Sequence, residues 1–287
     1  MPTIDLFGLL VPGELTRVFS DIHYGDRASR VRDLAQLTPL MREVDALVFN
    51  GDTMDTRTGP RPQHTEECRR AVVDLVARTD APVTFLTGNH DPDISSRHWH
   101  ELAGGEVLVV HGDVLFDDIV PWGRDARLIR ERIASAAGTA DDRKRLSLDD
   151  RLRIWREVAG SIPQRHQSER DPMRYAFHFA VDTIWPPTRF VQIIQAWRTE
   201  ADRAVALLRE QRPRAKYILL GHTHRPTIRR IAGGPIVINT GSFTAPFGGY
   251  AVDVASRQLR VRRIQYQQGL FQPGTAVAEF PLAFAGR

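Results

Sequence analysis

Residues 15–23 read LTRVFSDIH, and this stretch places an Asp-x-His pair directly after an apolar segment. The run at residues 15–20 predicts a short buried strand. In an extended backbone, side chains two residues apart point to the same side, so Asp21 and His23 can reach one bound group together. A carboxylate and an imidazole at this spacing are typical ligands of a metal ion.

The same arrangement of an apolar strand followed by polar residues recurs four times. Predicted strands at residues 45–50, 82–87, 107–110 and 217–220 end, in that order, in Gly51-Asp52, Gly88-Asn89-His90-Asp91, His111-Gly112-Asp113 and Gly221-His222-Thr223-His224. Sites in open α/β sheets form just outside the carboxyl ends of the strands. Any one of these motifs occurs often by chance, but five in one chain, each after its own strand, indicate a shared site.

Helical periodicity at residues 29–43 and 64–79 separates the first three strands. Alternating strands and helices predict βαβ units and the α/β fold class, with a largely parallel sheet. The tail from residue 272 onward has no clear pattern, and we expect it to be loosely ordered. Further strands are predicted at residues 227–231, 236–239, 250–254 and 258–264.

Residues 117–214 differ from the rest because they are highly charged and mostly helical in pattern. This segment lies between two of the polar motifs, where a lid or a substrate platform would be useful. We therefore divide the chain into a core of residues 1–116 and 215–287 and a helical insertion, or cap, of residues 117–214. Helices within it are expected at residues 124–137, 146–158, 172–185 and 188–210.

The length of 287 residues suits either one elaborated domain or a core plus an insertion. The formal net charge is +4, and there is a single cysteine, Cys68. No apolar run approaches the ~20 residues of a membrane span, and residues 6–11 lack the basic flank of a signal peptide. A lone cysteine excludes an internal disulfide framework, so a reducing, cytoplasmic setting is expected. The basic balance favours anionic partners, which include phosphates, nucleic acid and acidic lipid.

Together the five motifs resemble those of the calcineurin-like metallophosphoesterase superfamily, over about residues 15–264 apart from the insertion. The resemblance implies a four-layer α/β/β/α sandwich of two mixed sheets. It also implies two divalent transition metal ions, with Asp52 bridging both. The first would be bound by Asp21, His23 and His224, and the second by Asn89, His111 and His222. Mixed imidazole and oxygen ligands suit Mn, Fe or Zn, of which we favour Mn.

The reaction that the resemblance implies is hydrolysis of a phosphoester or pyrophosphate bond. Two metals ~3.5–4 Å apart would clamp the phosphate and lower the pKa of a bridging water, whose hydroxide attacks phosphorus. His90 resembles the family's general acid, which protonates the leaving oxygen, and Asp55 matches the residue that orients this histidine. Asp91 is expected to fix its loop through hydrogen bonds to backbone amides.

Two further features allow two interpretations each. The turn at residues 239–242, Asn-Thr-Gly-Ser, either supports the metal loops or is a plain turn. The histidines outside the motifs are interpreted as surface or packing residues, although His98 and His100 lie just after the Gly-Asn-His-Asp loop.

The insertion bears on the substrate. Its position is similar to that in the UDP-diacylglucosamine hydrolases of lipid A synthesis, where the insertion caps the site and holds acyl chains. Its aromatic and arginine side chains fit an acyl pocket with a phosphate-binding rim, or helices packing on one another. The chain departs from those hydrolases at His90, where they have arginine, and in residues 53–59. A phosphorylated small molecule and a lipid-linked nucleotide are therefore both candidate substrates, and the Arg-rich insertion would permit peripheral membrane contact.

Two other classes of function fit parts of the sequence. A non-catalytic metal-binding scaffold on the same fold usually has eroded ligands, whereas every ligand and the general acid are present here. Nucleic-acid processing fits the basic charge, but no alternation of aromatic and basic residues typical of strand-binding surfaces stands out.

Overall fold

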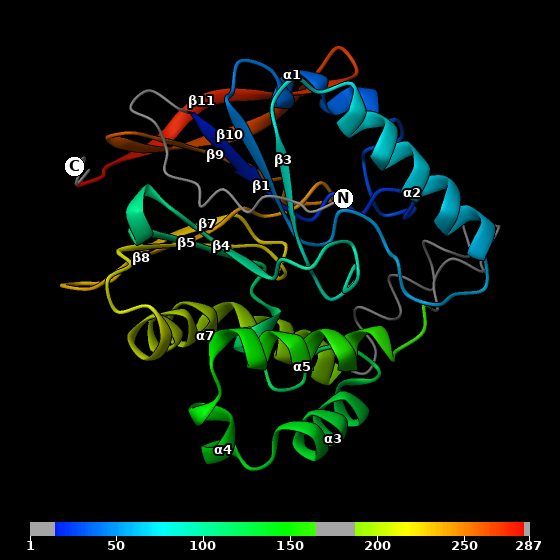
Figure 1. Cartoon of the computed structure of the whole chain (residues 1–287), viewed down its shortest axis with the longest axis vertical. Helices are drawn as coiled ribbons and strands as arrows, with labels where there is room; N and C mark the ends of the chain where they lie inside the picture. Colours follow the sequence, from blue (N-terminus) through cyan, green and yellow to red (C-terminus); the bar gives the residue numbers. More distant parts are fainter. Residues whose placement is uncertain (1–14, 165–186, 284–287) are drawn as a thin grey trace, which may run out of the picture.

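The computed structural model describes residues 15–164 and 187–283, which form two β-sheets covered by helices (Figure 1). The first sheet has the strand order β11-β10-β9-β1-β2-β3. Its parallel strands are β1 (Thr16–Phe19), β2 (Ala46–Asn50) and β3 (Val83–Leu86). The antiparallel strands β9 (Tyr250–Ala255), β10 (Gln258–Gln267) and β11 (Leu270–Pro281) extend it beyond β1.

The second sheet has the order β4-β5-β6-β8-β7. Strands β5 (Val107–Val110), β6 (Tyr217–Leu220) and β8 (Ile236–Asn239) run parallel. Strands β4 (Trp99–Leu102) and β7 (Thr227–Arg230) close the two edges antiparallel to their neighbours. Both sheets are mixed, as the family resemblance implies.

Helices cover the outer face of each sheet, and the two inner faces pack on each other (Figure 1). The short helices η1 (Leu34–Leu37) and α1 (Thr38–Met41) lie with α2 (Pro62–Ala77) over the first sheet. Over the second sheet lie α5 (Leu148–Gly160) and α7 (Pro187–Gln211), while α3 (Ala126–Ala137) packs against α5 and α4 (Ala140–Arg145) lies beside α3. The fold is therefore the expected layered α/β arrangement.

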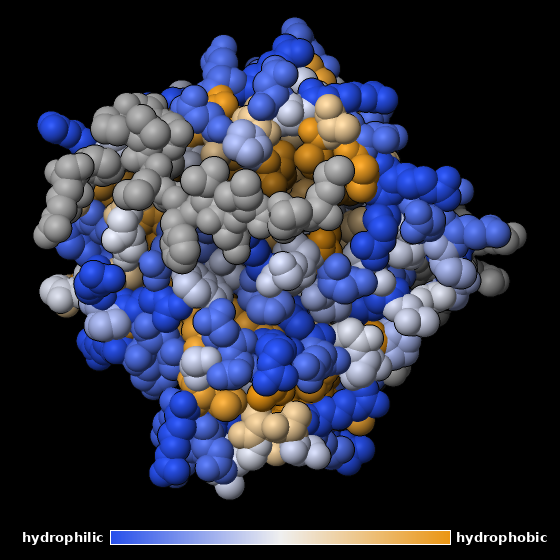
Figure 2. Space-filling model, in the orientation of Figure 1, coloured by the Kyte–Doolittle hydropathy of each residue, from blue (hydrophilic) through white to orange (hydrophobic). Residues whose placement is uncertain are grey.

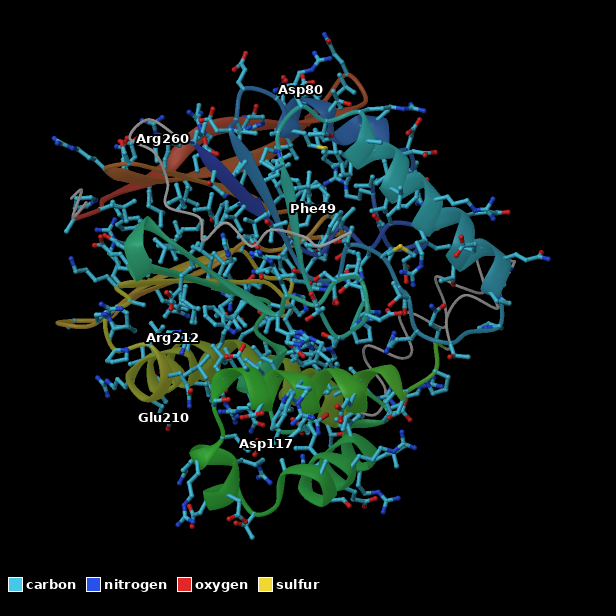
Figure 3. The ribbon with its side chains drawn as sticks, in the orientation of Figure 1. Phe49, Asp80, Asp117, Glu210, Arg212 and Arg260 are labelled. Carbon is cyan, nitrogen blue, oxygen red and sulfur yellow. The ribbon has the colours of Figure 1, made fainter. Side chains whose placement is uncertain are left out.

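Strand β5 shows why the apolar runs are continuous. Its Val107 and Val109 face the core between the sheets, while Leu108 and Val110 face the core under the helices. A strand buried on both faces needs apolar side chains at every position. Phe49 of β2 lies in the interior in the same way, with its ring centroid 4.8 Å from that of Phe19 (Figure 3).

Three expectations about secondary structure were wrong or incomplete. The helix expected at residues 29–43 is confined to residues 34–41, because Ser29 pairs with Thr244 and the side chain of Asp33 caps the start of η1. Pro39, which has no N–H, separates η1 from α1. The tail beyond residue 272 is not loose but forms most of β11. Its pairing with β10 shifts register near Pro273, which interrupted the pattern in the sequence. Strand β4 had no sequence signal. The helix expected at residues 172–185 lies outside the described residues.

The described part of the insertion is helical. Its helices α5 and α7 share one buried apolar cluster with strands β5 and β6 and form the outer layer of the second sheet. The division into a core of residues 1–116 and 215–287 and an insertion of residues 117–214 stays a prediction. Figure 2 shows a face dominated by hydrophilic side chains, with apolar ones in separate patches. In the described part of the chain, no helix is both long enough and apolar enough to cross a bilayer.

Candidate metal centre

The polar motifs meet where the carboxyl ends of the strands of both sheets come together. The amide of Asp21 donates to the Gly51 carbonyl at 3.1 Å, and the amide of Gly221 donates to the His111 carbonyl at 2.8 Å. The loops also demand glycine, since a Cβ on Gly88 would collide with the Asp52 carboxylate and one on Gly221 with that of Asp21. Close backbone approach thus brings the motifs to one site.

Five site residues other than glycine have a left-handed backbone, which costs free energy and persists only where the surroundings enforce it. Such conformations concentrate at functional sites. They belong to four of the predicted ligands and to the predicted bridge: Asp21, His23, His222 and His224, with Asp52. The loops are therefore held in one arrangement rather than relaxed.

One group of side chains forms a compact cluster. Asp21, His23, Asp52 and His224 place their ligand atoms within 4.8 Å of one another. His224 Nε2 lies 3.0 Å from His23 Nε2 and 3.2 Å from Asp21 Oδ1. Two imidazole nitrogens and a carboxylate oxygen that converge in this way can bind one transition metal ion.

A second group lies on the other side of Asp52. Asp52 Oδ2 is 3.8 Å from His23 Nε2 and 3.3 Å from His111 Nε2, so the carboxylate stands between the two groups. His111 Nε2 and Asn89 Oδ1 are both buried and find no hydrogen-bond partner within the described ranges. Leaving such atoms without a hydrogen bond is costly, and both are of a type that can bind a metal ion.

Three of the histidines are oriented through their second ring nitrogen. His111 Nδ1 lies 2.9 Å from the Asn50 carbonyl, and His222 Nε2 lies 2.8 Å from the Ile119 carbonyl. A carbonyl only accepts, so each of these nitrogens carries a proton, and only the other ring nitrogen could bind a metal. His224 Nδ1 contacts Thr244 Oγ1 at 3.2 Å, which leaves Nε2 facing Asp21.

The charges of the site shift its pKa values strongly. Burial by itself lowers the pKa of His111, but the carboxylates of Asp52 and Asp21 outweigh it and raise this pKa to about 10. His222 is buried and close to His111, and both effects lower its pKa, to about 4. Burial opposes ionisation of Asp21 and Asp52, yet the surrounding histidines hold both carboxyl pKa values below their usual range. The site is thus built around ionised carboxylates, which attract cations.

The predicted acid and its partner are also brought together. His90 Nδ1 lies 3.0 Å from Asp55 Oδ2, and the His90 ring meets His23 edge-on at 5.0 Å between centroids. The motifs gave no sign of Arg57, which donates to Asp55 Oδ2 at 2.7 Å and has Nη2 2.8 Å from His90 Nδ1. Despite burial, these charges lower the pKa of Asp55.

Asp91 does what the sequence predicted. Its carboxylate accepts from the amides of Gly88 at 2.7 Å, Asp52 at 2.9 Å and Thr53 at 2.7 Å, and so ties the loops after β2 and β3 together. The turn at residues 239–242 supports the metal loops, because Asn239 Nδ2 donates to the Gly221 carbonyl at 2.6 Å. His98 lies outside this cluster, and its Nδ1 is 2.8 Å from Thr87 Oγ1.

The insertion contributes two buried charged residues that the sequence did not single out. Arg156 of α5 binds the Asp113 carboxylate with both terminal nitrogens and donates through Nε to Thr87 Oγ1 at 2.7 Å. Glu200 of α7 accepts from Thr223 Oγ1 at 2.8 Å and from Asn239 Nδ2 at 2.7 Å. Burial raises the pKa of Glu200 to about 7. Charged residues on helices usually face solvent, so the sequence offered no signal for either.

Solved structures that match the chain include a dimetal phosphatase from Danio rerio. It is 12% identical, covers 96% of this chain and 100% of its own, and has a TM-score of 0.48. Vps29 from Chaetomium thermophilum is 11% identical, with 93% and 95% covered and a TM-score of 0.42. A conserved uncharacterized protein from Streptococcus pneumoniae, described as a predicted phosphoesterase, is 16% identical, with 94% and 99% covered and a TM-score of 0.38.

No curated protein sequence matches the chain. The sequence model of the calcineurin-like phosphoesterases, by contrast, matches residues 16–226, which include the first strand and all five polar motifs. On that match, the chain belongs to the calcineurin-like phosphoesterase family.

Proposed function

We propose that the protein is a hydrolase of a phosphoester or pyrophosphate bond that works with two divalent transition metal ions. The observation that carries this proposal is that the buried atoms His111 Nε2 and Asn89 Oδ1 make no hydrogen bond in the described ranges, while His111 Nε2 lies 3.3 Å from Asp52 Oδ2, itself part of the cluster with Asp21, His23 and His224. Asp21, His23 and His224 would hold one ion, Asn89, His111 and His222 the other, and Asp52 both. When bound, such ions polarise a phosphoryl oxygen and activate water.

The proton chemistry belongs to the chain itself. His90 is the proposed acid, and it would give a proton from Nε2 to the leaving oxygen while Asp55 Oδ2 holds its Nδ1. Arg57 donates hydrogen bonds to both oxygens of Asp55, from Nε at 3.0 Å and from Nη2 at 2.7 Å. These two bonds fix the orientation of the carboxylate beside His90. His90 is 30% exposed, which leaves it accessible to a substrate.

The substrate is a phosphorylated small molecule or a lipid-linked nucleotide, and UDP-diacylglucosamine is the specific alternative that the insertion suggests. The fully buried Trp155 supports the packing role of the insertion's aromatic residues instead, because its indole donates to the Phe116 carbonyl at 3.0 Å. We therefore favour the general proposal of a phosphoester or pyrophosphate hydrolase over the specific one of a UDP-diacylglucosamine hydrolase.

Metal analysis of the purified protein tests the proposal, together with hydrolysis of p-nitrophenyl phosphate and of its bis-ester. We expect two transition metal ions per chain and activity stimulated by Mn²⁺. His111→Ala should retain fewer ions than wild type, whereas His100→Ala, outside the centre, is the matched control. A wild-type protein with no bound transition metal and no Mn-stimulated activity would identify the fold as a scaffold.

A further inference from the structure

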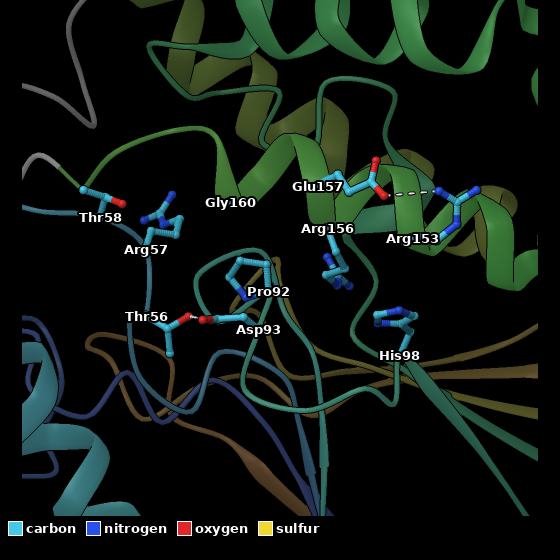
Figure 4. Close-up of a pocket in the computed structure, with 10 residues that line it drawn as sticks. All are labelled: Thr56, Arg57, Thr58, Pro92, Asp93, His98, Arg153, Arg156, Glu157 and Gly160. Atoms are coloured by element: carbon cyan, nitrogen blue, oxygen red, sulfur yellow. Dashed lines mark hydrogen bonds and ion pairs between the residues drawn. The ribbon is translucent and has the colours of Figure 1, made fainter.

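A cavity of about 360 Å³ lies where the insertion meets the loops of the core (Figure 4). One wall is formed by residues 56–58 after β2, another by Pro92 and His98 after β3, and the third by Arg153 and Gly160 of α5. Its size lies within the ordinary range for small-molecule sites, roughly 300–1,000 Å³. No residue of the proposed metal set lines it.

This cavity adjoins the proposed acid. Arg57 forms part of its wall and has Nη2 2.8 Å from His90 Nδ1. Thr56, also in the wall, donates its amide to the His90 carbonyl at 2.9 Å. A general acid stands beside the bond whose leaving oxygen it protonates, so the leaving group must lie on the His90 side of the centre.

Arginines outnumber acidic side chains in the cavity walls. Arg57, Arg153 and Arg156 line it together with Asp93 and Glu157. The side chain of Arg153 is 58% exposed and pairs with Glu157 at 3.1 Å and with Asp150 at 3.5 Å. Exposed pairs of this kind are weak, so the guanidinium can turn to a ligand at little cost. A guanidinium matches the oxygens of phosphate in a bidentate manner.

We propose that this cavity is the subsite for the leaving group and that it favours a leaving group carrying its own phosphate, as in cleavage of a pyrophosphate bond. This inference rests on the proposed function, because it takes His90 as the acid. Arg153 is the residue that distinguishes a phosphorylated leaving group from an uncharged one. Gly160 keeps the cavity open.

Two nucleotides test the inference, because both present a terminal phosphoryl group and differ in the leaving group. In both, the oxygen of water bonds to the terminal phosphorus and the bond from phosphorus to the bridging oxygen breaks. The bridging oxygen keeps the electron pair and is protonated. AMP then releases adenosine, which is uncharged, and ADP releases AMP, which carries phosphate. The measurement is the ratio of kcat/KM for ADP to that for AMP.

Wild type should prefer ADP, and Arg153→Ala should lower the ratio about tenfold, the loss expected for one charged hydrogen bond. Arg127→Ala removes an arginine from α3 that is 90% exposed and pairs with Glu131, and it serves as the matched control. Gly160→Leu fills the cavity, since a Cβ there meets only Pro92 Cγ at an ordinary 3.5 Å. It should reduce hydrolysis of both nucleotides more than that of p-nitrophenyl phosphate.

The inference would be overturned if Arg153→Ala and Arg127→Ala had the same ratio of kcat/KM for ADP to that for AMP, and Gly160→Leu lost equal activity on all three substrates. Failure of both nucleotides to react or to inhibit, in an enzyme active on p-nitrophenyl phosphate, would overturn it too. If the nucleotides only inhibit, their inhibition constants replace kcat/KM in the ratio. A wild-type protein without metal or phosphoesterase activity contradicts the proposed function instead.

Discussion

Glu200 of the insertion accepts a hydrogen bond at 2.8 Å from the hydroxyl of Thr223, the residue between the two histidines of the Gly-His-Thr-His motif. Trp197, one turn earlier on α7, donates from its indole to the Thr223 carbonyl at 3.1 Å. Helix α7 thus fixes the loop that carries His222 and His224 through two hydrogen bonds to Thr223. The insertion is part of the support of the proposed metal centre as well as a cover for the second sheet.

Glu200→Leu should lower the free energy of unfolding by roughly 2–3 kcal/mol, because buried donors on Thr223 and Asn239 lose their acceptor. Glu200→Gln keeps an acceptor oxygen and should lose much less. Urea denaturation measures the difference, and the exposed Glu210 on the same helix, labelled in Figure 3, gives the control Glu210→Leu. Equal effects of Glu200→Leu and Glu210→Leu would contradict the supporting role.

The free energy of unfolding should depend on pH through the titration of Glu200. Burial raises its pKa from the ordinary 4.5 to about 7 in the folded chain. The protonated form therefore contributes stability below pH 4.5, and this contribution is lost as the pH rises through 7. Glu200→Gln does not titrate, so its stability relative to wild type should rise over this interval, by at most about 1.4 kcal/mol per pH unit. Unfolding in the presence of a chelator, at several pH values, checks this. A flat difference would refute it.

Removal of metal should destabilise the protein, because ions that bind only the folded state stabilise it by mass action. The effect is about 2.7 kcal/mol at a free metal concentration 100 times the Kd. We expect EDTA to lower Tm and excess Mn²⁺ to restore it. Asp52→Ala, which removes the carboxylate between His23 and His111, should abolish the response to Mn²⁺. A Tm in wild type that is insensitive to both reagents would argue against the centre.

His90→Ala should retain the metal ions. Its loss of activity should increase with the basicity of the leaving oxygen. General acid catalysis contributes roughly 10²–10⁴-fold, most of it where the leaving oxygen is basic. The loss should be large with an alkyl phosphate and smaller with p-nitrophenyl phosphate. Asp55→Asn should follow the same trend more weakly, since Asp55 Oδ2 contacts His90 Nδ1 at 3.0 Å. Equal losses on both substrates would exclude the acid role.

Arg156→Leu should be severely destabilising, by about 3–5 kcal/mol, because it leaves the buried Asp113 carboxylate without its partner. The double variant Arg156→Leu/Asp113→Leu should recover part of the loss, since no uncompensated charge then remains. Chemical denaturation of the two single variants and the double variant gives the coupling energy. Additive losses would show that the pair does not act as a unit.

The sequence located the site because its residues follow strands, and parallel strands end at a common edge. Asp21, Asp52 and His111 were predicted in this way. The same approach missed Arg57, Arg156 and Glu200, because a charged residue on a helix or loop ordinarily lies in solvent. It also missed β4 and most of β11, where Pro273 and Gly274 interrupt the pattern at a register shift.

The sequence by itself determined the α/β class and the residue types of the candidate site, because local patterns of apolar and polar residues encode strands and the turns that follow them. Only the tertiary structure decided which atoms lack partners, which charged residues are buried, and where a cavity adjoins His90. These properties depend on contacts between segments far apart in the chain, such as Glu200 with Thr223 and Arg156 with Asp113. Burial and pairing are properties of packing, and no local pattern records them.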